Sequence, residues 1–426
     1  MRGIYAFAFL ALWIQACGGA EEGTGDESPA GGDGISENTA VALTVSALSD
    51  VTEYQDVTLR VEAIDGQGQR DESYYGEASI VVSRGQFSLS VGQIEAGVGE
   101  VTGYFDREGT VLMDIASKGM VGQGSFPVGA ATWARGPTEW VMSGVVNELN
   151  HWTFGGFWDG SIIPHEEKWV GFFLVSNSPG LDGTPSAVLS RLVSSDQGAS
   201  WALEPEGPVL DDTRGASVFI NEDGTWVLWS LGEEERVLTR FTSNDWGKTW
   251  NPTDCNVALG NSVWNAGGVA SPSAWESTDG SSVRVWFTGL DSNTPPRRVI
   301  GLIQGSCGGE WGNPVVAIGM GSTSTWNESS VSSPVVWREG STWKLMGAGR
   351  SSGTAPPSLG YWTSDDGLVW EESPANPVVT RTSGVGTWDA RGIDFPAIIL
   401  PEGEKPTLFF SGIPSDWRPR LVRAVP

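Results

Sequence analysis

The sequence predicts an all-β protein in which a β-sandwich is followed by a five-bladed β-propeller. Residues 39–135 contain about seven short runs that alternate apolar and polar positions between turn signals, which is typical of a sandwich. In residues 136–426, tryptophans recur at matched positions ahead of strand-like apolar runs. A fixed period of this size, filled with short strands, indicates the blades of a propeller.

The first residues predict export from the cytoplasm. An apolar run from Ile4 to Ile14 is too short to span a bilayer as a mature helix, and small residues follow it, as in a secretory signal. The end of this run, Ile14-Gln15-Ala16-Cys17, resembles a bacterial lipobox, which implies that Cys17 is lipidated and becomes the mature N-terminus. The alternative is an ordinary signal peptide with a chance cysteine.

We therefore expect a lipoprotein signal peptide at 1–16 and a flexible acidic tether at 17–38, because the tether has almost no bulky apolar residue with which to fold. Gly18 follows the cysteine, and the lipobox resemblance then implies the outer membrane or the cell surface.

The net charge of −27 argues against nucleic acid and anionic lipid as partners, since both require surfaces rich in lysine and arginine. We expect membrane contact only through the lipid anchor, and a monomer. The charge favours solubility at a cell surface over the binding of a cation or a basic ligand. Two histidines are too few for a histidine-rich metal site, so no cofactor is expected. Loop oxygens could bind Ca²⁺, but such groups are too common to indicate it.

The predicted sandwich strands include 41–45, 57–61, 79–82 and 110–114. The runs that begin at Asp56 (DVTLRVEAIDGQG), Gly76 (GEASIVVS) and Gly97 (GVGEVTGYF) resemble the Ig-like domains of invasin-type bacterial surface proteins. The resemblance implies a spacer or an adhesive module, and we favour the spacer.

Four tryptophans mark the propeller repeats. Each lies eight residues ahead of a glycine or proline that opens a strand, and the last three follow one another at intervals of 62 residues: Trp152, Trp264, Trp326 and Trp388. The inner strands of the five blades are expected to start near Ser161, Ser217, Ser273, Val335 and Ala397. The strand 139–143 is expected to complete the last blade and close the ring, which removes exposed sheet edges. A sixth blade would need about fifty more residues.

Three hairpins carry the pattern Ser/Thr-x-Asp-x-Gly-x-x-Trp, ending at Trp201, Trp250 and Trp370. They resemble the Asp boxes of sialidases and other propellers, and a degenerate copy ends at Trp311. The aspartate can accept hydrogen bonds from its own turn, the glycine can take a positive φ, and the tryptophan can be buried between sheets. We expect structural roles on the outer rim for Asp196, Asp245 and Asp365.

Cys255 and Cys307 fall near the ends of consecutive repeats, where neighbouring blades could bring them together. In an oxidising compartment the pair could form a disulfide, and the sequence leaves this pairing open.

The loops that lead into the inner strands should surround the mouth of the central channel, where propellers normally bind ligands. These loops hold aromatic rings, carboxylates and arginines, which is what sugar binding needs. The ligand-binding candidates are Trp158, Arg214, Asp389 and Arg391. The repeated tryptophans are expected to pack between blades, whereas Trp158 breaks the repeat and is the better sugar platform.

The propeller resembles glycoside hydrolase family 43 and its relatives, on the strand that begins Asp159-Gly160-Ser161. The resemblance implies that Asp159 is the general base. At the places of the family's pKa-modulating aspartate and general acid this chain has Ser271 and Ser332, which cannot serve. Glu328 is our candidate acid, and Asp394, two residues before a proline, is the reserve. Inverting hydrolysis needs two such carboxyl groups roughly 6.5–9.5 Å apart.

The predicted function is that of a cell-envelope lipoprotein whose propeller mouth binds a glycan, with hydrolysis of a glycosidic bond uncertain because the carboxylate set is incomplete. The alternative is a non-catalytic adhesion or protein-interaction lipoprotein, with the propeller as a rigid platform. Sialidase activity is disfavoured, because the mouth loops lack a matched arginine cluster and a tyrosine nucleophile.

Replacement of the candidate lipidated cysteine tests the predicted anchor. Cys17→Ser should move the protein from the membrane fraction to the soluble fraction after cell lysis, because the acyl chains can no longer be attached. Fractionation and immunoblotting measure this shift. A mutant that stays in the membrane fraction would contradict the lipobox interpretation.

Overall fold

A computed structural model describes residues 40–89, 91–131, 133–135, 157–176, 187–204, 207–211, 213–232, 236–277, 279–382, 387–401, 404–415 and 419–425. The predicted signal peptide, Cys17, Trp152 and the predicted strand 139–143 lie outside these residues. The described elements are β-strands, apart from one short 3-10 turn at Val263–Asn265. Among the described residues, no helix has both the length and the apolar character needed to cross a membrane.

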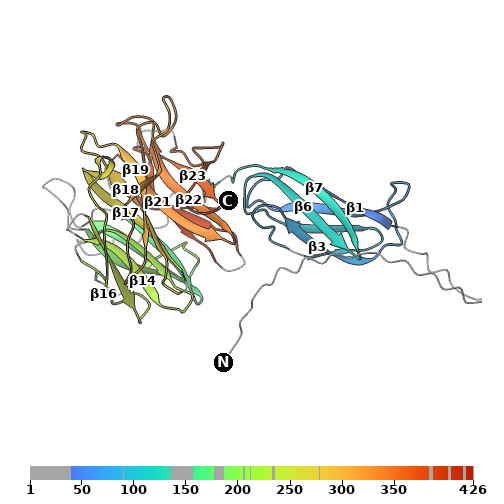
Figure 1. Cartoon of the computed structure of the whole chain (residues 1–426), viewed down its shortest axis with the longest axis horizontal. Coiled ribbons are helices and arrows are strands. Elements are labelled where there is room, and N and C mark those ends of the chain that lie inside the picture. Colours follow the sequence, from blue (N-terminus) through green and yellow to red (C-terminus); the bar gives the residue numbers. More distant parts are fainter. Residues whose placement is uncertain are drawn as a thin grey trace, which may run out of the picture. The chain divides into compact units, whose positions relative to one another are not determined.

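The N-terminal domain is a β-sandwich, as predicted (Figure 1). Inward-facing residues of both sheets, among them Leu59, Val61, Met113 and Ile115, form one buried core. The first sheet has the order β1-β2-β5, and the second has the order β4-β3-β6-β7. The strands are β1 (Ala40–Ala47), β2 (Val57–Asp65), β3 (Gly76–Val82), β4 (Val91–Ile94), β5 (Val98–Gly103), β6 (Gly109–Ser117) and β7 (Met120–Val128).

Five four-stranded blades follow, which confirms the predicted five-bladed propeller. Each predicted inner-strand start lies within the first strand of a blade. The strands are β9 (Phe157–His165), β10 (Lys168–Ser176), β11 (Ala187–Ser194) and β12 (Ala202–Leu203) in blade one; β13 (Thr213–Ile220), β14 (Trp226–Gly232), β15 (Val237–Ser243) and β16 (Asn251–Ala258) in blade two; β17 (Gly268–Glu276), β18 (Val283–Leu290), β19 (Arg298–Gly305) and β20 (Val315–Ile318) in blade three; β21 (Ser330–Glu339), β22 (Thr342–Arg350), β23 (Ser358–Ser364) and β24 (Glu371–Glu372) in blade four; and β25 (Ile393–Ile399), β26 (Thr407–Gly412), β27 (Arg420–Val425) and β8 (Ala134–Arg135) in blade five.

The ring closes where β8 pairs with β27, through Ala134 opposite Val425 and Arg135 opposite Ala424. We expected residues 139–143 to supply this strand, but the described partner of β27 comes from the last two residues assigned to the sandwich. The pairing covers the edge of β27, which would otherwise be an open template for another chain.

Aromatic rings fill the seams between blades. The last tryptophan of each hairpin motif contacts the second strand of the preceding blade, with ring centroids 5.7–6.2 Å apart: Trp201 with Phe409, Trp250 with Phe172, Trp311 with Trp229, and Trp370 with Trp286. Rings of this size bury large apolar areas. These four contacts therefore join blades one to five, two to one, three to two and four to three.

Blade five has no such motif, and residues of the N-terminal domain occupy the remaining seam. Tyr54 and Trp133 share a buried cluster with Met346 of β22, the strand that receives a ring at the other seams. The buried ammonium of Lys344 donates to the Tyr54 hydroxyl and forms an ion pair with Glu339 at 2.9 Å. The N-terminal domain thus completes the ring of packed seams.

The repeated loop tryptophans lie against their own blades, within buried clusters that also contain residues of the preceding blade, which agrees with the packing between blades that we expected. Trp264 stacks on Phe287 with ring centroids 5.7 Å apart, Trp326 lies 5.7 Å from Trp362, and Trp388 lies close over Gly412. The glycines beneath these rings leave no Cβ in the way, which allows the close approach.

The third hairpin motif uses different residues from those we assigned. Ser364 and Asp366 form the turn, because the Asp366 carboxylate accepts hydrogen bonds from the backbone N–H groups of Leu368 and Val369. Asp365 instead pairs with Arg107 of the N-terminal domain at 2.6 Å. In the first two motifs, Asp196 and Asp245 bind their own turns as expected.

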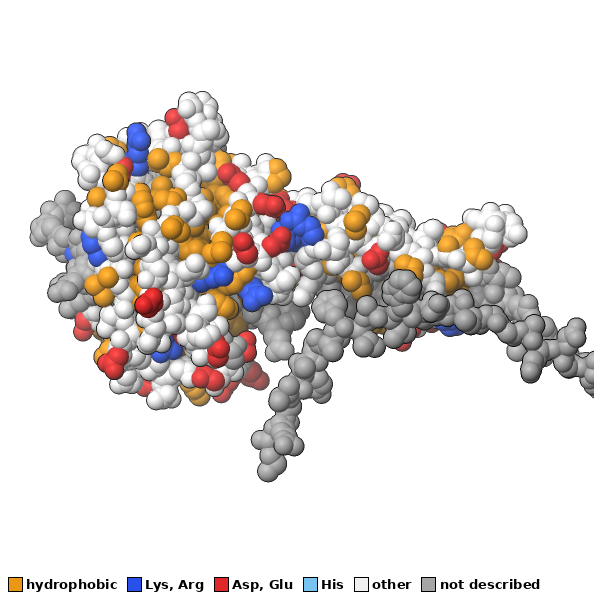
Figure 2. Space-filling view, in the orientation of Figure 1, with side chains coloured by type: hydrophobic (Ala, Val, Ile, Leu, Met, Phe, Trp, Pro, Cys, Tyr) orange, Lys and Arg blue, Asp and Glu red, His pale blue; other side chains and the backbone are white. Residues whose placement is uncertain are grey.

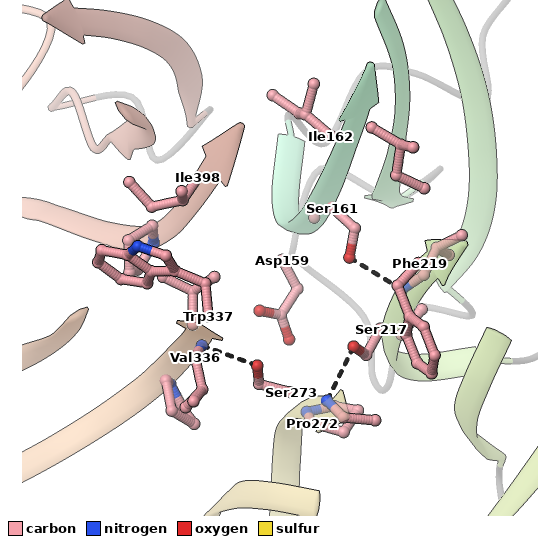
Figure 3. A pocket seen from close by; sticks show the side chains of 18 of the residues that line it. Asp159, Ser161, Ile162, Ser217, Phe219, Pro272, Ser273, Val336, Trp337 and Ile398 are labelled. Atoms are coloured by element: carbon pink, nitrogen blue, oxygen red, sulfur yellow. Dashed lines mark hydrogen bonds between the residues drawn. The ribbon is translucent and has the colours of Figure 1, made fainter. Parts of the chain in front are cut away.

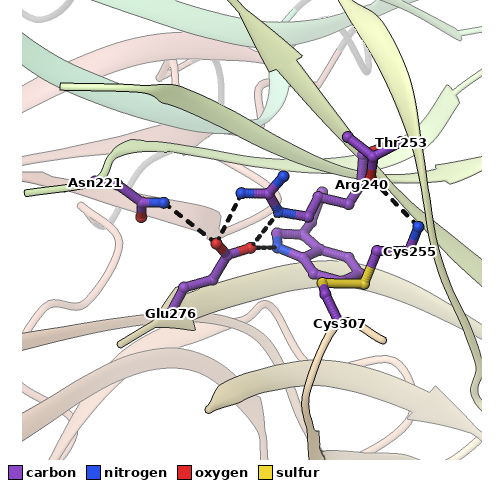
Figure 4. Close-up of a disulfide and its surroundings, with 7 residues drawn as sticks. Asn221, Arg240, Thr253, Cys255, Glu276 and Cys307 are labelled. Atoms are coloured by element: carbon purple, nitrogen blue, oxygen red, sulfur yellow. Dashed lines mark hydrogen bonds and ion pairs between the residues drawn. A yellow bond between two sulfur atoms is a disulfide. The ribbon is translucent and has the colours of Figure 1, made fainter. Parts of the chain in front are cut away.

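Charged side chains are spread over the face that Figure 2 shows rather than gathered into a single patch. Cys255 of β16 and Cys307, which follows β19, form a disulfide that joins blades two and three (Figure 4). Beside it, Glu276 accepts hydrogen bonds from Arg240 and from the indole N–H of Trp229.

Removal of this disulfide should lower the free energy of unfolding. The bond closes a loop of 52 residues, and the loss of its constraint on the unfolded chain corresponds to about 4 kcal/mol in the chain-entropy account. Denaturant unfolding of Cys255→Ser/Cys307→Ser beside the oxidised wild type measures the loss. Equal midpoints and slopes would show that the bond does not stabilise the native state.

Candidate functional site

The inner strands β9, β13, β17, β21 and β25 surround a cavity of about 360 Å³ in the centre of the propeller (Figure 3). Its walls are largely apolar and include Ile162, Phe219, Val336, Trp337 and Ile398. Asp159 is the single charged side chain among the described residues that line it.

Every inner strand is irregular at the same level. The pairing with the second strand skips residues around Asp159, Arg214, Ser271, Ser333 and Phe395. Ser271, Ser333 and Phe395 have φ values of 48°, 53° and 52°, and a proline follows each. A left-handed backbone is costly for such residues, and it persists only where the surroundings hold it. These five bulges define the mouth of the channel.

Just inside the mouth, three serines connect neighbouring blades. Ser161 accepts a hydrogen bond from the N–H of Val218 at 3.0 Å, and Ser217 accepts one from Ala274 at 2.9 Å. Ser273 accepts one from Val336 at 2.9 Å. None of the three hydroxyls donates to another described residue, so their protons are available to a ligand in the cavity.

The Asp159 carboxyl lies between these walls and points into the cavity (Figure 3). Part of the residue faces the cavity, but protein surrounds the carboxyl group closely. This burial raises its pKa from 3.8 to about 7; the hydroxyl of Ser271 lowers the pKa by a hydrogen bond, and the negative charge of Asp394 raises it. Ser271 therefore contacts Asp159 from the bulge of blade three.

Asp394 belongs to the same site, although it is 2% exposed. Its carboxylate accepts a hydrogen bond from the N–H of Phe395 at 2.9 Å and lies 3.9 Å from the Arg350 guanidinium. The negative charge of Asp394 therefore acts on Asp159, and one arginine lies beside Asp394.

Glu328 has a different environment. Its carboxylate accepts a hydrogen bond from the backbone N–H of Ser324 at 2.7 Å, within its own loop, and it is not among the residues that line the cavity. Its candidacy as an acid stays a prediction that rests on the sequence alone.

The candidate ligand-binding residues divide into two groups. Trp158 is half-buried beside Asp159, with its ring edge-on to Phe395 at 5.5 Å, and Arg214 is exposed at the bulge of blade two. Asp389 is fully buried and accepts hydrogen bonds from Thr382, while Arg391 is exposed and donates to the carbonyl of Ser415 at 3.3 Å. Trp158 and Arg214 thus lie at or beside the bulges of blades one and two, although neither is among the residues that line the cavity. Asp389 and Arg391 instead hydrogen-bond to neighbouring loops.

Sequence reasoning did not identify the serine hydroxyls or Arg350 as parts of the site. Ser161, Ser217 and Ser273 recur at intervals of 56 residues, a signal that was present in the predicted inner-strand starts. No comparable repeat marks Arg350, which is the last residue of the second strand of blade four. Within the described part of the chain, no group of three or more metal-ligating side chains could hold an ion.

Comparison with known proteins shows the type of fold. No protein-family model and no curated protein matches the sequence. Similar solved structures include a glycoside hydrolase (TM-score 0.52, 10% identity, covering 65% of this chain and 88% of that chain). A glycosyl hydrolase from Bacteroides ovatus has a TM-score of 0.51, with 12% identity over 69% of this chain and 94% of that chain.

An α-L-arabinofuranosidase from Podospora anserina, solved in complex with cellotriose, has a TM-score of 0.50, with 14% identity over 69% of this chain and 96% of that chain. The structural similarity shows that the chain has a propeller fold of the glycoside hydrolase type. At identities this low it assigns no role to any residue.

The raised pKa of Asp159 predicts how Asp159→Asn changes stability with pH. Between about pH 4 and 7 the native carboxyl keeps a proton that the unfolded chain has lost, so the wild type loses stability as pH rises through this range. The amide cannot ionise, so Asp159→Asn should be more stable than wild type at pH 8. The difference should shrink towards pH 4. Unfolding midpoints at both pH values measure this, and a difference independent of pH would contradict the raised pKa.

Proposed function

We propose that this protein is a cell-envelope lipoprotein, anchored through Cys17, whose propeller binds a glycan at the mouth of its central channel. The observation that carries the proposal is the mouth itself: one carboxyl group, Asp159, at the top of a largely apolar cavity with available serine hydroxyls. Such a combination of apolar walls and a few convergent polar groups is typical of small-ligand sites.

The groups at the mouth fit the two surfaces of a sugar ring. Asp159 and the hydroxyl of Ser161 offer hydrogen-bonding groups in the cavity, and the half-buried indole of Trp158, next to Asp159 on the same strand, would offer an apolar ring beside it. The likeness to glycoside hydrolase propellers supports the same ligand class.

Hydrolysis of a glycosidic bond is the second candidate function, favoured by the pairing of Asp159 with Asp394. Two carboxyl groups in different environments are the pattern of an acid and a base. A pKa of about 7 suits Asp159 to donate a proton, and Asp394 would then activate water. This reverses the role that the family resemblance implies for Asp159. Serines at 271 and 332, and the loop hydrogen bond of Glu328, favour binding without catalysis.

Binding at the mouth predicts that Trp158→Ala weakens glycan affinity by about tenfold or more, since loss of one stacked ring removes its apolar contact. Trp246→Ala is the matched control, because Trp246 is an exposed indole on a hairpin of blade two. A glycan array followed by calorimetry measures both variants. Equal losses, or none for Trp158→Ala, would exclude the mouth as the binding site.

If the propeller hydrolyses glycosidic bonds, turnover should depend on Asp159. Asp159→Asn should reduce the release of reducing ends by at least about 100-fold while the protein stays folded, because a general acid or base contributes about that much. Unchanged turnover would remove Asp159 from the mechanism. Binding without any turnover in the wild type would identify a non-catalytic propeller.

A further inference from the structure

We infer that Arg298, Ser330 and Arg350 form an anion-binding subsite beside the channel mouth, which takes the carboxylate of an acidic sugar. The inference rests on the proposed function, because it names the class of glycan. It depends on three residues that the fold places in one row.

The row crosses three adjacent strands where blades three and four meet. Arg298 at the start of β19 pairs with Ser330 at the start of β21, and Ser330 pairs with Arg350 at the end of β22. Residues directly opposite each other on neighbouring strands project to the same face of a sheet, so the two arginines flank the serine. The row therefore presents two guanidinium groups and one hydroxyl together.

The hydroxyl of Ser330 lacks a partner. The residue is 3% exposed, and its Oγ atom is buried without a hydrogen bond to any described group. Buried polar groups are nearly always hydrogen-bonded, and an unmade bond costs free energy. An anionic oxygen at this point would accept the missing bond.

Arg298 also has unused donors. The residue is half-buried at the start of its strand, and its guanidinium group forms no hydrogen bond or ion pair with the described residues. Arg350 donates to the carbonyl of Ala355 at 2.9 Å and lies 3.9 Å from Asp394. Burial lowers the pKa of Arg350; the charge of Asp394 raises it and that of Arg298 lowers it, so the two guanidinium charges act on each other.

Of the two guanidinium groups in the row, Arg298 has no ion pair with a described carboxylate, whereas Arg350 lies 3.9 Å from Asp394. The carboxylate of Asp291 accepts hydrogen bonds from the backbone N–H groups of Asn293 and Arg297. The guanidinium groups of Arg298 and Arg350 thus lie near each other in a chain of net charge −27. Guanidinium groups bind carboxylates and phosphates through charge-assisted hydrogen bonds.

The subsite lies next to the proposed glycan site. Arg350 contacts Asp394, whose charge in turn acts on Asp159 in the channel. A sugar ring at the mouth would thus have a carboxylate-binding group to one side, as a uronic acid requires. Free phosphate shares this chemistry, and the experiment separates the two sources.

The test compares uronic-acid polysaccharides with the same polysaccharides after reduction of their carboxyl groups to alcohols. The wild type should bind the acidic forms at least about tenfold more tightly, as expected for charge-assisted bonds. Arg298→Gln should lose this preference, and Ser330→Ala should weaken it. Arg297→Gln, the same charge change on the exposed neighbouring side chain, should keep it.

Equal binding of acidic and reduced forms, or a preference that survives in Arg298→Gln, would overturn the subsite and leave glycan binding intact. If the wild type binds no polysaccharide, the proposed function fails and the acidic-sugar inference fails with it. A rise of Tm in inorganic phosphate that Arg298→Gln abolishes would then assign the row to a free anion instead.

Discussion

The burial of aromatic rings between blades is the interaction on which the rest of this structure depends. Four seams are filled by a tryptophan that follows a tight hairpin, and the fifth is filled by Tyr54 and Trp133 of the N-terminal domain. Each ring buries a large apolar surface that no single blade could cover. Because every blade is held on both sides, the five inner strands are fixed around one channel. The buried ammonium of Lys344 requires an opposite charge, and Glu339 provides it at the fifth seam. This ion pair makes the packing of that seam specific.

That rigid ring explains how an unfavourable arrangement persists at the mouth. Three residues before prolines keep a left-handed backbone, and Asp159 keeps a carboxyl group among apolar walls where its charged form is disfavoured. Backbone strain and perturbed pKa values of this kind cluster at functional sites. Asp394 and the adjacent arginines give the mouth a mixed charge that suits a polar ligand with an anionic group.

The fold could be predicted from the sequence because its signals are periodic. The hairpin tryptophans and the inner strands recur at regular intervals, and each predicted inner-strand start lies within the first strand of an observed blade. The functional site was harder to predict from the sequence, because it depends on contacts between blades. No local pattern indicates that Ser271 reaches Asp159, that Arg350 pairs with Asp394, or that Asp365 turns away from its hairpin to Arg107. The last of these requires the N-terminal domain, which the repeat does not encode.

A crystal structure of the Asp159→Asn variant with a bound oligosaccharide would test the central claim most directly. The account predicts a sugar ring at the channel mouth, against the indole of Trp158 and within hydrogen-bonding distance of residue 159 and of Ser161. A sugar bound on the N-terminal sandwich or on the outer hairpins, with the mouth unchanged, would contradict it.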